Sequence, residues 1–460
     1  MPSLFARTAL LPTGWAEDVL VAYDKDGWIV GVETGKAPSS DDNDVEAVPG
    51  VLVPGLVNAH SHAFQRALAG LTERGAGRKK SFWSWRDTMY RFVSKLSPDD
   101  MHALAKGVYT DMLKAGYTSV GEFHYLHHDP EGKAYTDIAE MSHQVIRAAM
   151  ETGIAITHMP ALYAFGGVGG QPAVEGQRRF LNTVPSLLQM LEKLQKDYAG
   201  IPQVSFGFAH HSLRAVTPDM LRDGTRAARR LMPDVPIHIL AGAQRAEVED
   251  CLAWSGLSPA GWLMEYGDVD ENWSFIHALH MTEEDTRSMA AMGIVAVLCP
   301  TSEANHGAGV FPLLHYLQCG GRFAIGSASN VSVDALEELR WLEYLQRVQA
   351  GERVILYTDE LTSVGATLFE RTVQGGARAL KRKTGRIAVG CRADFVVLDT
   401  DLPSMAGKLR DHVLDTAIFA AAETPVLHVM SGGRWAVRDR RHRREDQIRD
   451  SLRKVLQNLS

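Results

Sequence analysis

Short apolar runs alternate with longer amphipathic stretches through the middle of the chain. Eight of these runs are rich in β-branched residues, and their continuous apolar character predicts buried strands. They are Val51–His62, Tyr117–Tyr125, Ile154–Leu162, Gln203–Ser212, Pro236–Gly242, Trp273–His280, Ile294–Pro300 and Arg322–Asn330. Segments with helical spacing lie between them, among them Asp99–Ala115, Asp137–Thr152, Glu175–Lys196, Pro218–Leu231 and Glu283–Met292. The alternation predicts an α/β fold whose eight parallel strands form a (β/α)8 TIM-like barrel.

The two ends of the chain have a different pattern. Residues 1–50 and 386–440 contain short alternating segments with Gly turns, such as Val19–Tyr23 and Phe395–Leu398. We interpret them as one small β-domain formed by both termini, with the barrel at 51–385. Residues 441–460 predict a charged C-terminal helix. Its basic start is expected to be solvated, because the chain as a whole is acidic.

Composition narrows the class of protein. The chain has 460 residues, a net charge of -7 and 45% hydrophobic residues, which is typical of a globular protein and argues against a general nucleic-acid binder. The 4 Cys form no CxxC pair, so neither a disulfide framework nor a cysteine zinc site is indicated. No run reaches the roughly 18 apolar residues of a membrane span, and the N-terminus is a poor signal peptide. We therefore expect a reduced, cytoplasmic protein that acts on a small molecule, without a nucleic-acid or membrane partner.

Polar residues gather where the predicted strands end. His60 and His62 lie two apart and so face the same way on a strand. The other strand ends carry Glu122, His124, Tyr125, His210, His211, His277 and His280, and the loop after strand seven carries Glu303 and His306. In a barrel these positions point into the active site, and clustered imidazoles are typical ligands of a transition metal.

Several of these motifs are similar to those of one enzyme family. Val53-Pro54-Gly55-Leu56-Val57-Asn58-Ala59-His60-Ser61-His62 resembles the first-strand HxH signature of the amidohydrolase superfamily. Narrower matches are the runs His60–Ala67, Glu122–Tyr125, His211–Val216, Glu303–Asn305 and Glu337–Tyr344. Together they resemble the formimidoylglutamate deiminase family over nearly the whole chain. Such enzymes hydrolyse the formimino C–N bond in histidine degradation and release N-formyl-L-glutamate and ammonia.

The resemblance implies a zinc site and a set of binding residues. The zinc ion is held by two histidines of strand one, a His of strand five and an Asp of strand eight, and it lowers the pKa of a bound water to about 7. His60 and His62 match the first two ligands, and His277 matches a strand-six His that polarises the centre. The substrate-binding positions are matched by Gln65, Arg86, Tyr125, His211 and Arg214. The resemblance also implies a homodimer.

Four positions depart from this pattern. In strand five, Leu240 stands at the ligand position and Ala243 at the position of a proton-shuttling Glu. In strand eight, Ala328 replaces the Asp ligand and Asn330 a neighbouring His. His238 has the same strand parity as Leu240, but it lies about 6–7 Å deeper in the barrel. With only His60 and His62 left of its usual ligands, zinc should bind weakly or not at all. We therefore predict severely impaired deiminase activity.

The selective loss of these side chains leaves several readings open. The chain is either an engineered scaffold, with its metal site removed to create a new pocket, or a natural pseudoenzyme kept for binding. Leu and Ala in place of ligands predict an apolar cavity suited to a small ligand. The functional alternatives are a metal-free small-molecule binding protein and a metal-independent hydrolase in which Glu303 pairs with His306 as catalytic groups.

Overall fold

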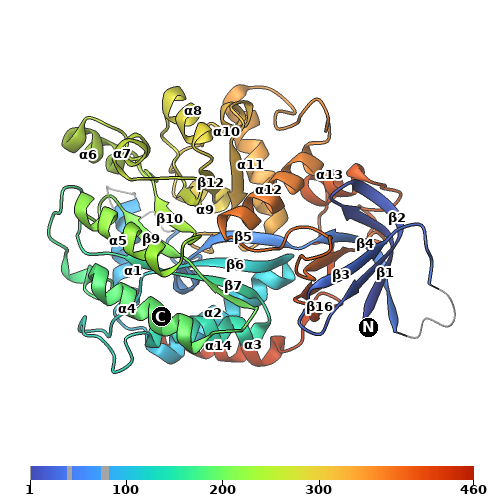
Figure 1. Ribbon diagram of the computed structural model, residues 1–460, viewed down its shortest axis with the longest axis horizontal. Coiled ribbons are helices and arrows are strands. Elements are labelled where there is room, and N and C mark those ends of the chain that lie inside the picture. The colour runs from blue at the N-terminus through green and yellow to red at the C-terminus, as the bar shows by residue number, and fades with distance from the viewer. Residues whose placement is uncertain (1, 39–43, 74–81, 460) are drawn as a thin grey trace.

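The larger part of the molecule is a parallel barrel (Figure 1). The computed structural model describes residues 2–38, 44–73 and 82–459. The barrel strands are β5 (Leu56–Ser61), β6 (Tyr117–His124), β7 (Ala155–Leu162), β9 (Phe208–Ser212), β10 (Ile237–Leu240), β11 (Trp273–Ile276), β12 (Val295–Leu298) and β13 (Arg322–Ile325). They lie in the order β13-β12-β11-β10-β9-β7-β6-β5, and a parallel bridge between Ser61 and Ala328 joins the two ends. The predicted barrel fold is confirmed.

Each predicted strand corresponds to a strand of this barrel. The predicted strand Gln203–Ser212 contains two, because β8 (Val204–Phe206) pairs only with β7 and the next strand, β9, joins the barrel. The barrel strands are buried along nearly their whole length, which explains their continuous apolar pattern.

Helices surround the barrel. They are α1 (Phe82–Val93), α2 (Pro98–Lys114), α3 (Glu140–Thr152), α4 (Val184–Asp197), α5 (Pro218–Leu231), α6 (Arg245–Ser255), α7 (Pro259–Tyr266), α8 (Glu283–Ala291), α9 (Pro300–Asn305), α10 (Leu313–Gln318), α11 (Ala335–Ala350), α12 (Val364–Ala379) and α13 (Asp411–Phe419), with 3-10 turns at Ala63–Leu68 and Glu175–Gln177. Capping residues in the sequence determine where several of these helices begin. Ser97 accepts a hydrogen bond from the backbone N–H of Asp100, and Thr217 caps α5 in the same way ahead of Pro218.

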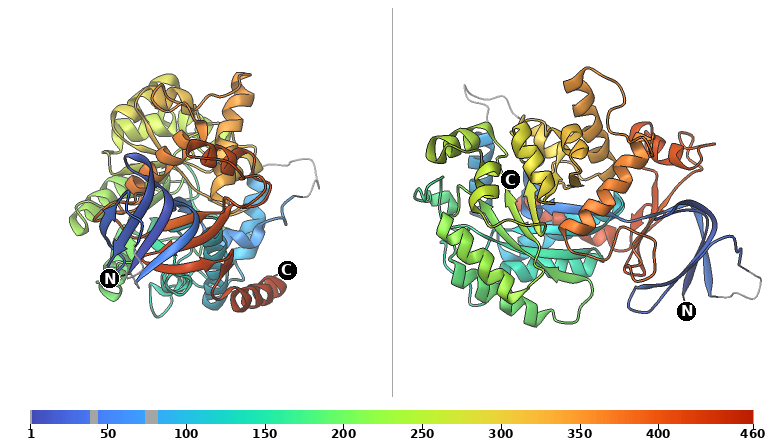
Figure 2. Two further views of the ribbon diagram at one scale, coloured as in Figure 1. Left: turned by 90° about the vertical axis from the view of Figure 1, so that its right-hand side faces the viewer. Right: turned by 45° about the horizontal axis from the view of Figure 1, so that its top comes forward.

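A second sheet is built from both ends of the chain, as predicted. Its strands are β1 (Ser3–Leu11), β2 (Gly14–Tyr23), β3 (Ile29–Glu33), β4 (Val45–Pro54), β14 (Phe395–Leu398), β15 (Val426–Ser431), β16 (Arg434–Arg438) and β17 (Arg441–His442), and most of them pair antiparallel. The sheet lies beside the start of the barrel strands, where the Ser431 hydroxyl donates to the carbonyl of Thr118 (Figure 2). It therefore stands away from the strand ends that form the site.

The bounds of β4 differ from the predicted boundary between the small β-domain and the barrel at residue 50. β4 runs through residue 50 and continues to Pro54, where it leads directly into β5. The predicted charged helix is α14 (Glu445–Leu459), which packs against α2 through contacts such as that of Leu452 with Gly107. Within the described residues, no helix combines the length and apolar character required to cross a membrane.

Candidate active site at the barrel mouth

A cavity opens where the barrel strands end. All the residues predicted for catalysis, substrate binding or metal binding line it except His60, which is fully buried against His62. The altered positions Leu240, Ala243 and Ala328 line the same cavity. The fold therefore brings the predicted site residues together, and their roles stay predictions.

The two histidines of β5 converge on each other. Their Nε2 atoms are 3.1 Å apart, and Nδ1 of His62 is 2.8 Å from the carbonyl oxygen of Phe123. That carbonyl requires a donor, so His62 carries its proton on Nδ1 and its Nε2 is an acceptor. Burial lowers the pKa of His62 to about 4 and that of His60 well below its usual value. Both rings are therefore neutral at pH 7, which is the state that binds metals.

Among the described residues, no group that includes His60 and His62 brings three potential ligand atoms within 4.8 Å of one another. A hydrolytic zinc ion normally has three protein ligands, but Leu240 and Ala328 have no donor atoms. The amide nitrogen of Asn330 donates to the carbonyl of His62, and its oxygen accepts from Ser327. The Nε2 atom of His238 is 2.8 Å from the carbonyl oxygen of Ala379, so this nitrogen is already hydrogen-bonded to the backbone that follows the barrel. The donor set around His60 and His62 does not fit the zinc site of the resemblance.

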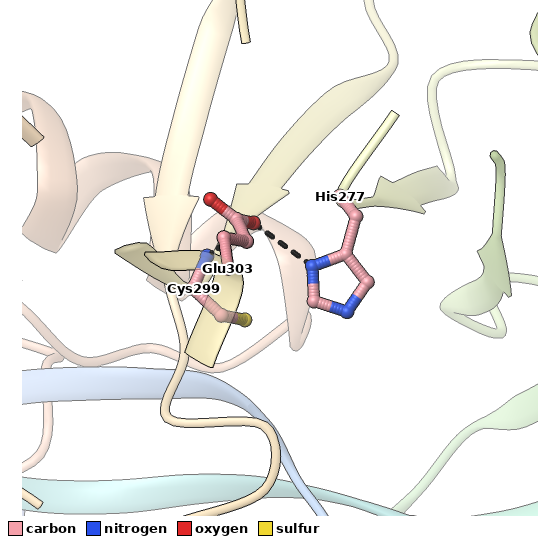
Figure 3. A group of neighbouring side chains, drawn as sticks. All are labelled: His277, Cys299 and Glu303. Carbon is pink, nitrogen blue, oxygen red and sulfur yellow. Dashed lines mark hydrogen bonds and ion pairs between the residues drawn. The ribbon is translucent and has the colours of Figure 1, made fainter. Parts of the chain in front are cut away.

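A second group of donor atoms lies on the neighbouring strand ends (Figure 3). Nδ1 of His277 is 2.8 Å from Oε1 of Glu303, and the backbone N–H of Cys299 donates to the same oxygen. Of the residues the structure describes, His277, Cys299 and Glu303 form the one group of three potential metal ligands whose donor atoms lie within 4.8 Å of one another. Sequence reasoning missed Cys299, because a single cysteine carries no spacing signal.

Glu303 pairs with His277, and the catalytic role predicted for Glu303 with His306 stays a prediction. The carboxylate of Glu303 turns toward His277, because α9 begins at Pro300 and places Glu303 in its first turn, beside the end of β11. His306 follows that helix and packs its ring against Trp85 and Phe82, with ring centroids 4.7 and 5.5 Å away. Burial lowers the pKa of His306 to about 4, so its ring is neutral at pH 7.

The predicted substrate-binding residues all line the cavity. Gln65 donates to the hydroxyl of Tyr125 at 2.7 Å. Nε of Arg214 lies 3.2 Å from a carboxylate oxygen of Glu247, and that ion pair is almost fully buried. The guanidinium carbon of Arg86 lies 4.4 Å from the ring centre of Trp83. The role of Glu247 in balancing Arg214 was not expected.

Aromatic residues of α1 were also missed as part of the site. Phe82, Trp83, Trp85 and Tyr90 all line the cavity, together with Phe180 from the loop before α4. The dense aromatic run at the start of α1 is a signal that could have indicated this wall. It makes the mouth suitable for the apolar part of a ligand, with arginines available for its charged part.

The backbone at the mouth is strained at four residues. His277, Ala278, Ala328 and Asn330 have φ angles of 66°, 50°, 40° and 56°, in the left-handed region that non-glycine residues rarely adopt. Hydrogen bonds hold this geometry, for example from the N–H of Ala328 to the carbonyl of His60 at 3.0 Å. Such strain clusters at functional sites. Here the strained residues lie next to the His60–His62 pair and the His277–Glu303 pair.

Two family models match the chain. The amidohydrolase family matches residues 51–436, and the N-terminal domain of formimidoylglutamate deiminase matches residues 1–45. The formimidoylglutamate deiminase of Pseudomonas aeruginosa is 44% identical over 459 residues, which is 100% of both chains. A 5-methylthioadenosine/S-adenosylhomocysteine deaminase of Halobacterium salinarum is 28% identical and covers 92% of this chain and 89% of its own.

Solved structures agree with the assignment. An amidohydrolase from Brucella melitensis has a TM-score of 0.93 and 42% identity over 100% of both chains. A zinc-bound adenosine deaminase from Xanthomonas campestris, with a TM-score of 0.81 and 21% identity, covers 99% of this chain and 98% of its own and shares the fold. With this fold, these strand-end motifs and 44% identity to a formimidoylglutamate deiminase over the full length, the chain belongs to the formimidoylglutamate deiminase family of amidohydrolases.

Proposed function

We propose that this family member binds a small amino-acid-derived anion of the formimidoylglutamate class at the barrel mouth and does not hydrolyse it through a zinc-bound hydroxide. The observation that carries the proposal is the lining of the cavity, in which Leu240 and Ala328 stand beside the imidazoles without a donor atom. The chain keeps the family's binding wall and lacks part of its reaction centre.

The loss of hydrolysis follows from the energetics of water activation. Zinc lowers the pKa of a bound water from 15.7 to about 7, which is worth on the order of 10 kcal/mol as a ceiling. Two histidines alone bind the ion weakly. Ala243 also offers no carboxylate to move a proton between the water and the leaving ammonia. Packing cannot replace either contribution.

Retention of binding is supported by the charges and rings around the cavity. Arg86 and Arg214 supply guanidinium groups, which suit carboxylates because their N–H groups form a planar fork. The Nε atom of Arg86 is buried and has no hydrogen-bond partner among the described residues. Gln65 and Tyr125 already form a hydrogen-bonded pair that lines the same cavity, and they add polar groups for orientation.

Calorimetry and an ammonia assay on the purified chain test the proposal. We expect saturable binding of N-formimidoyl-L-glutamate and no ammonia release above background with added zinc. The variant Arg86→Gln should weaken binding at least tenfold, and Arg91→Gln, on the exposed side of the same helix, is the matched control. Ammonia release at an enzymatic rate, or the absence of binding, would contradict the proposal.

A triple variant tests why hydrolysis is lost. Leu240→His, Ala243→Glu and Ala328→Asp together should restore zinc binding and ammonia release, because they supply the missing donors and the proton shuttle. Release that persists in the unmodified chain after chelation would instead favour metal-independent hydrolysis, with His277 held by Glu303 as the base.

A further inference from the structure

We propose that His277, Cys299 and Glu303 form a binding site for a divalent transition-metal ion of the zinc type, separate from His60 and His62. The three residues follow two neighbouring strands. His277 comes directly after β11, Cys299 directly after β12, and Glu303 lies one turn into α9 (Figure 3). Their donor atoms lie within 4.8 Å of one another. The proposal goes beyond the proposed function and does not depend on it.

The donor types favour a particular class of ion. An imidazole nitrogen, a thiolate sulfur and a carboxylate oxygen are the three kinds of ligand that zinc takes in proteins, at about 2.0–2.3 Å. The sulfur selects against magnesium and calcium, which prefer oxygen ligands. A thiolate and a carboxylate also balance the two positive charges of the ion, so the filled site is neutral overall. That neutrality matters because Cys299 and Glu303 are buried, and an uncompensated buried charge is costly.

The scaffold already holds two of the three ligands close together. The His277 nitrogen is 2.8 Å from the Glu303 oxygen, and around a tetrahedral ion two such donors stand roughly 3.3 Å apart. The backbone N–H of Cys299 also donates to that carboxylate at 2.8 Å, which fixes the cysteine backbone beside it. Side-chain adjustment would therefore be needed chiefly to bring the Cys299 sulfur to coordination distance of the same ion.

The site has a closed side and an open side. His277 and Glu303 line the cavity, whereas Cys299 is fully buried behind them. A fourth coordination position would therefore face the cavity, where a ligand group completes the coordination. The His277 ring lies 6.0 Å from the His60 ring, centroid to centroid, so an ion here sits beside the His60–His62 pair but is held by other residues.

Cobalt provides a direct test, because a thiolate bound to Co²⁺ gives a charge-transfer band in the near-ultraviolet. The full-length protein is stripped with a chelator and titrated with Co²⁺, and bound metal is counted by elemental analysis. We expect one equivalent of cobalt and the thiolate band. In Cys299→Ser the band should disappear and the affinity should fall at least tenfold. Cys251→Ser removes another buried cysteine and should leave the band unchanged.

Two further variants distinguish this site from the other imidazoles. Glu303→Gln should weaken cobalt binding while circular dichroism remains unchanged, and it provides a second test if Cys299→Ser fails to fold. His62→Ala should leave the thiolate band in place. The proposal is overturned if no band forms, if the band survives in Cys299→Ser, or if His62→Ala alone abolishes metal binding. Because these measurements contain no formimidoylglutamate, their failure is distinguishable from failure of the proposed function.

Discussion

Arg214 is paired with Glu247 inside the barrel mouth, where Nε of the arginine lies 3.2 Å from a carboxylate oxygen. Their side chains are 10% and 2% exposed. The second carboxylate oxygen of Glu247 accepts the backbone N–H of Ala243. Glu247 stabilises the guanidinium charge and so raises the pKa of Arg214. A ligand carboxylate that uses Arg214 therefore competes with a carboxylate already in place.

Glu247→Gln should strengthen the binding of an anionic ligand. The amide keeps an acceptor oxygen but removes the negative charge beside Arg214, so we expect the dissociation constant for N-formimidoyl-L-glutamate to fall about tenfold. Folding stability should fall by about 1–3 kcal/mol, because the buried guanidinium loses its counter-ion. Calorimetry and urea unfolding measure the two effects. Glu249→Gln, exposed on the same helix, is the control, and weaker ligand binding by Glu247→Gln would refute the competition.

Buried histidines should make the protein sensitive to acid. Burial lowers the pKa of His158 to about 3, and neither of its ring nitrogens has a hydrogen-bond partner among the described residues. The unfolded chain binds a proton near pH 6.5 and the folded chain near pH 3, so stability falls as the pH drops between these values. His158→Leu should reduce this dependence by about 1.4 kcal/mol per pH unit, measured by urea unfolding. His412→Gln changes an exposed ring and should leave the slope unchanged.

Glu122 should make the folded protein less stable as the pH rises, which is opposite to the effect of His158. Burial raises its pKa from 4.5 to about 8, while one carboxyl oxygen accepts the backbone N–H of Ala63 at 2.7 Å. The folded chain retains a proton that the unfolded chain loses, so stability falls as the pH rises from about 4.5 to about 8. Glu122→Gln should remove a slope of about 1.4 kcal/mol per pH unit and be more stable than the parent at pH 8. An unchanged slope, relative to the exposed control Glu131→Gln, would mean that Glu122 is ionised in the folded protein.

His306 is expected to act through packing. Its ring lies against Trp85 and Phe82, and no hydrogen bond joins it to Glu303 among the bonds of the described residues. His306→Phe should therefore keep the dissociation constant for the ligand within about twofold, because ring volume is preserved. His306→Ala should lower folding stability by about 1–2 kcal/mol. If His306→Phe is folded but no longer binds ligand, the imidazole itself contacts the ligand.

Sequence reasoning predicted the architecture because the signals were local and repeated. The predicted helix Pro218–Leu231 is found with the same bounds, since Thr217 caps it and Pro218 occupies its first turn. The strands were recognisable because both faces are buried, which makes their apolar runs continuous. The split of Gln203–Ser212 into β8 and β9 was missed. Gly207 separates them, and a Cβ at that position would lie 2.8 Å from Met159, so glycine permits a close approach between strands.

The order of apolar and polar residues determined the barrel, the two-ended sheet and the histidines and carboxylates at the strand ends, because strand parity and strand ends are properties of neighbouring residues. Tertiary structure decided which of those side chains pair. Glu303 selects His277 over His306, Arg214 meets Glu247, and Cys299 comes beside both members of the first pair. These partners lie on different strands and helices, and their distances depend on how the closed barrel sets one strand end against the next, which no local pattern encodes.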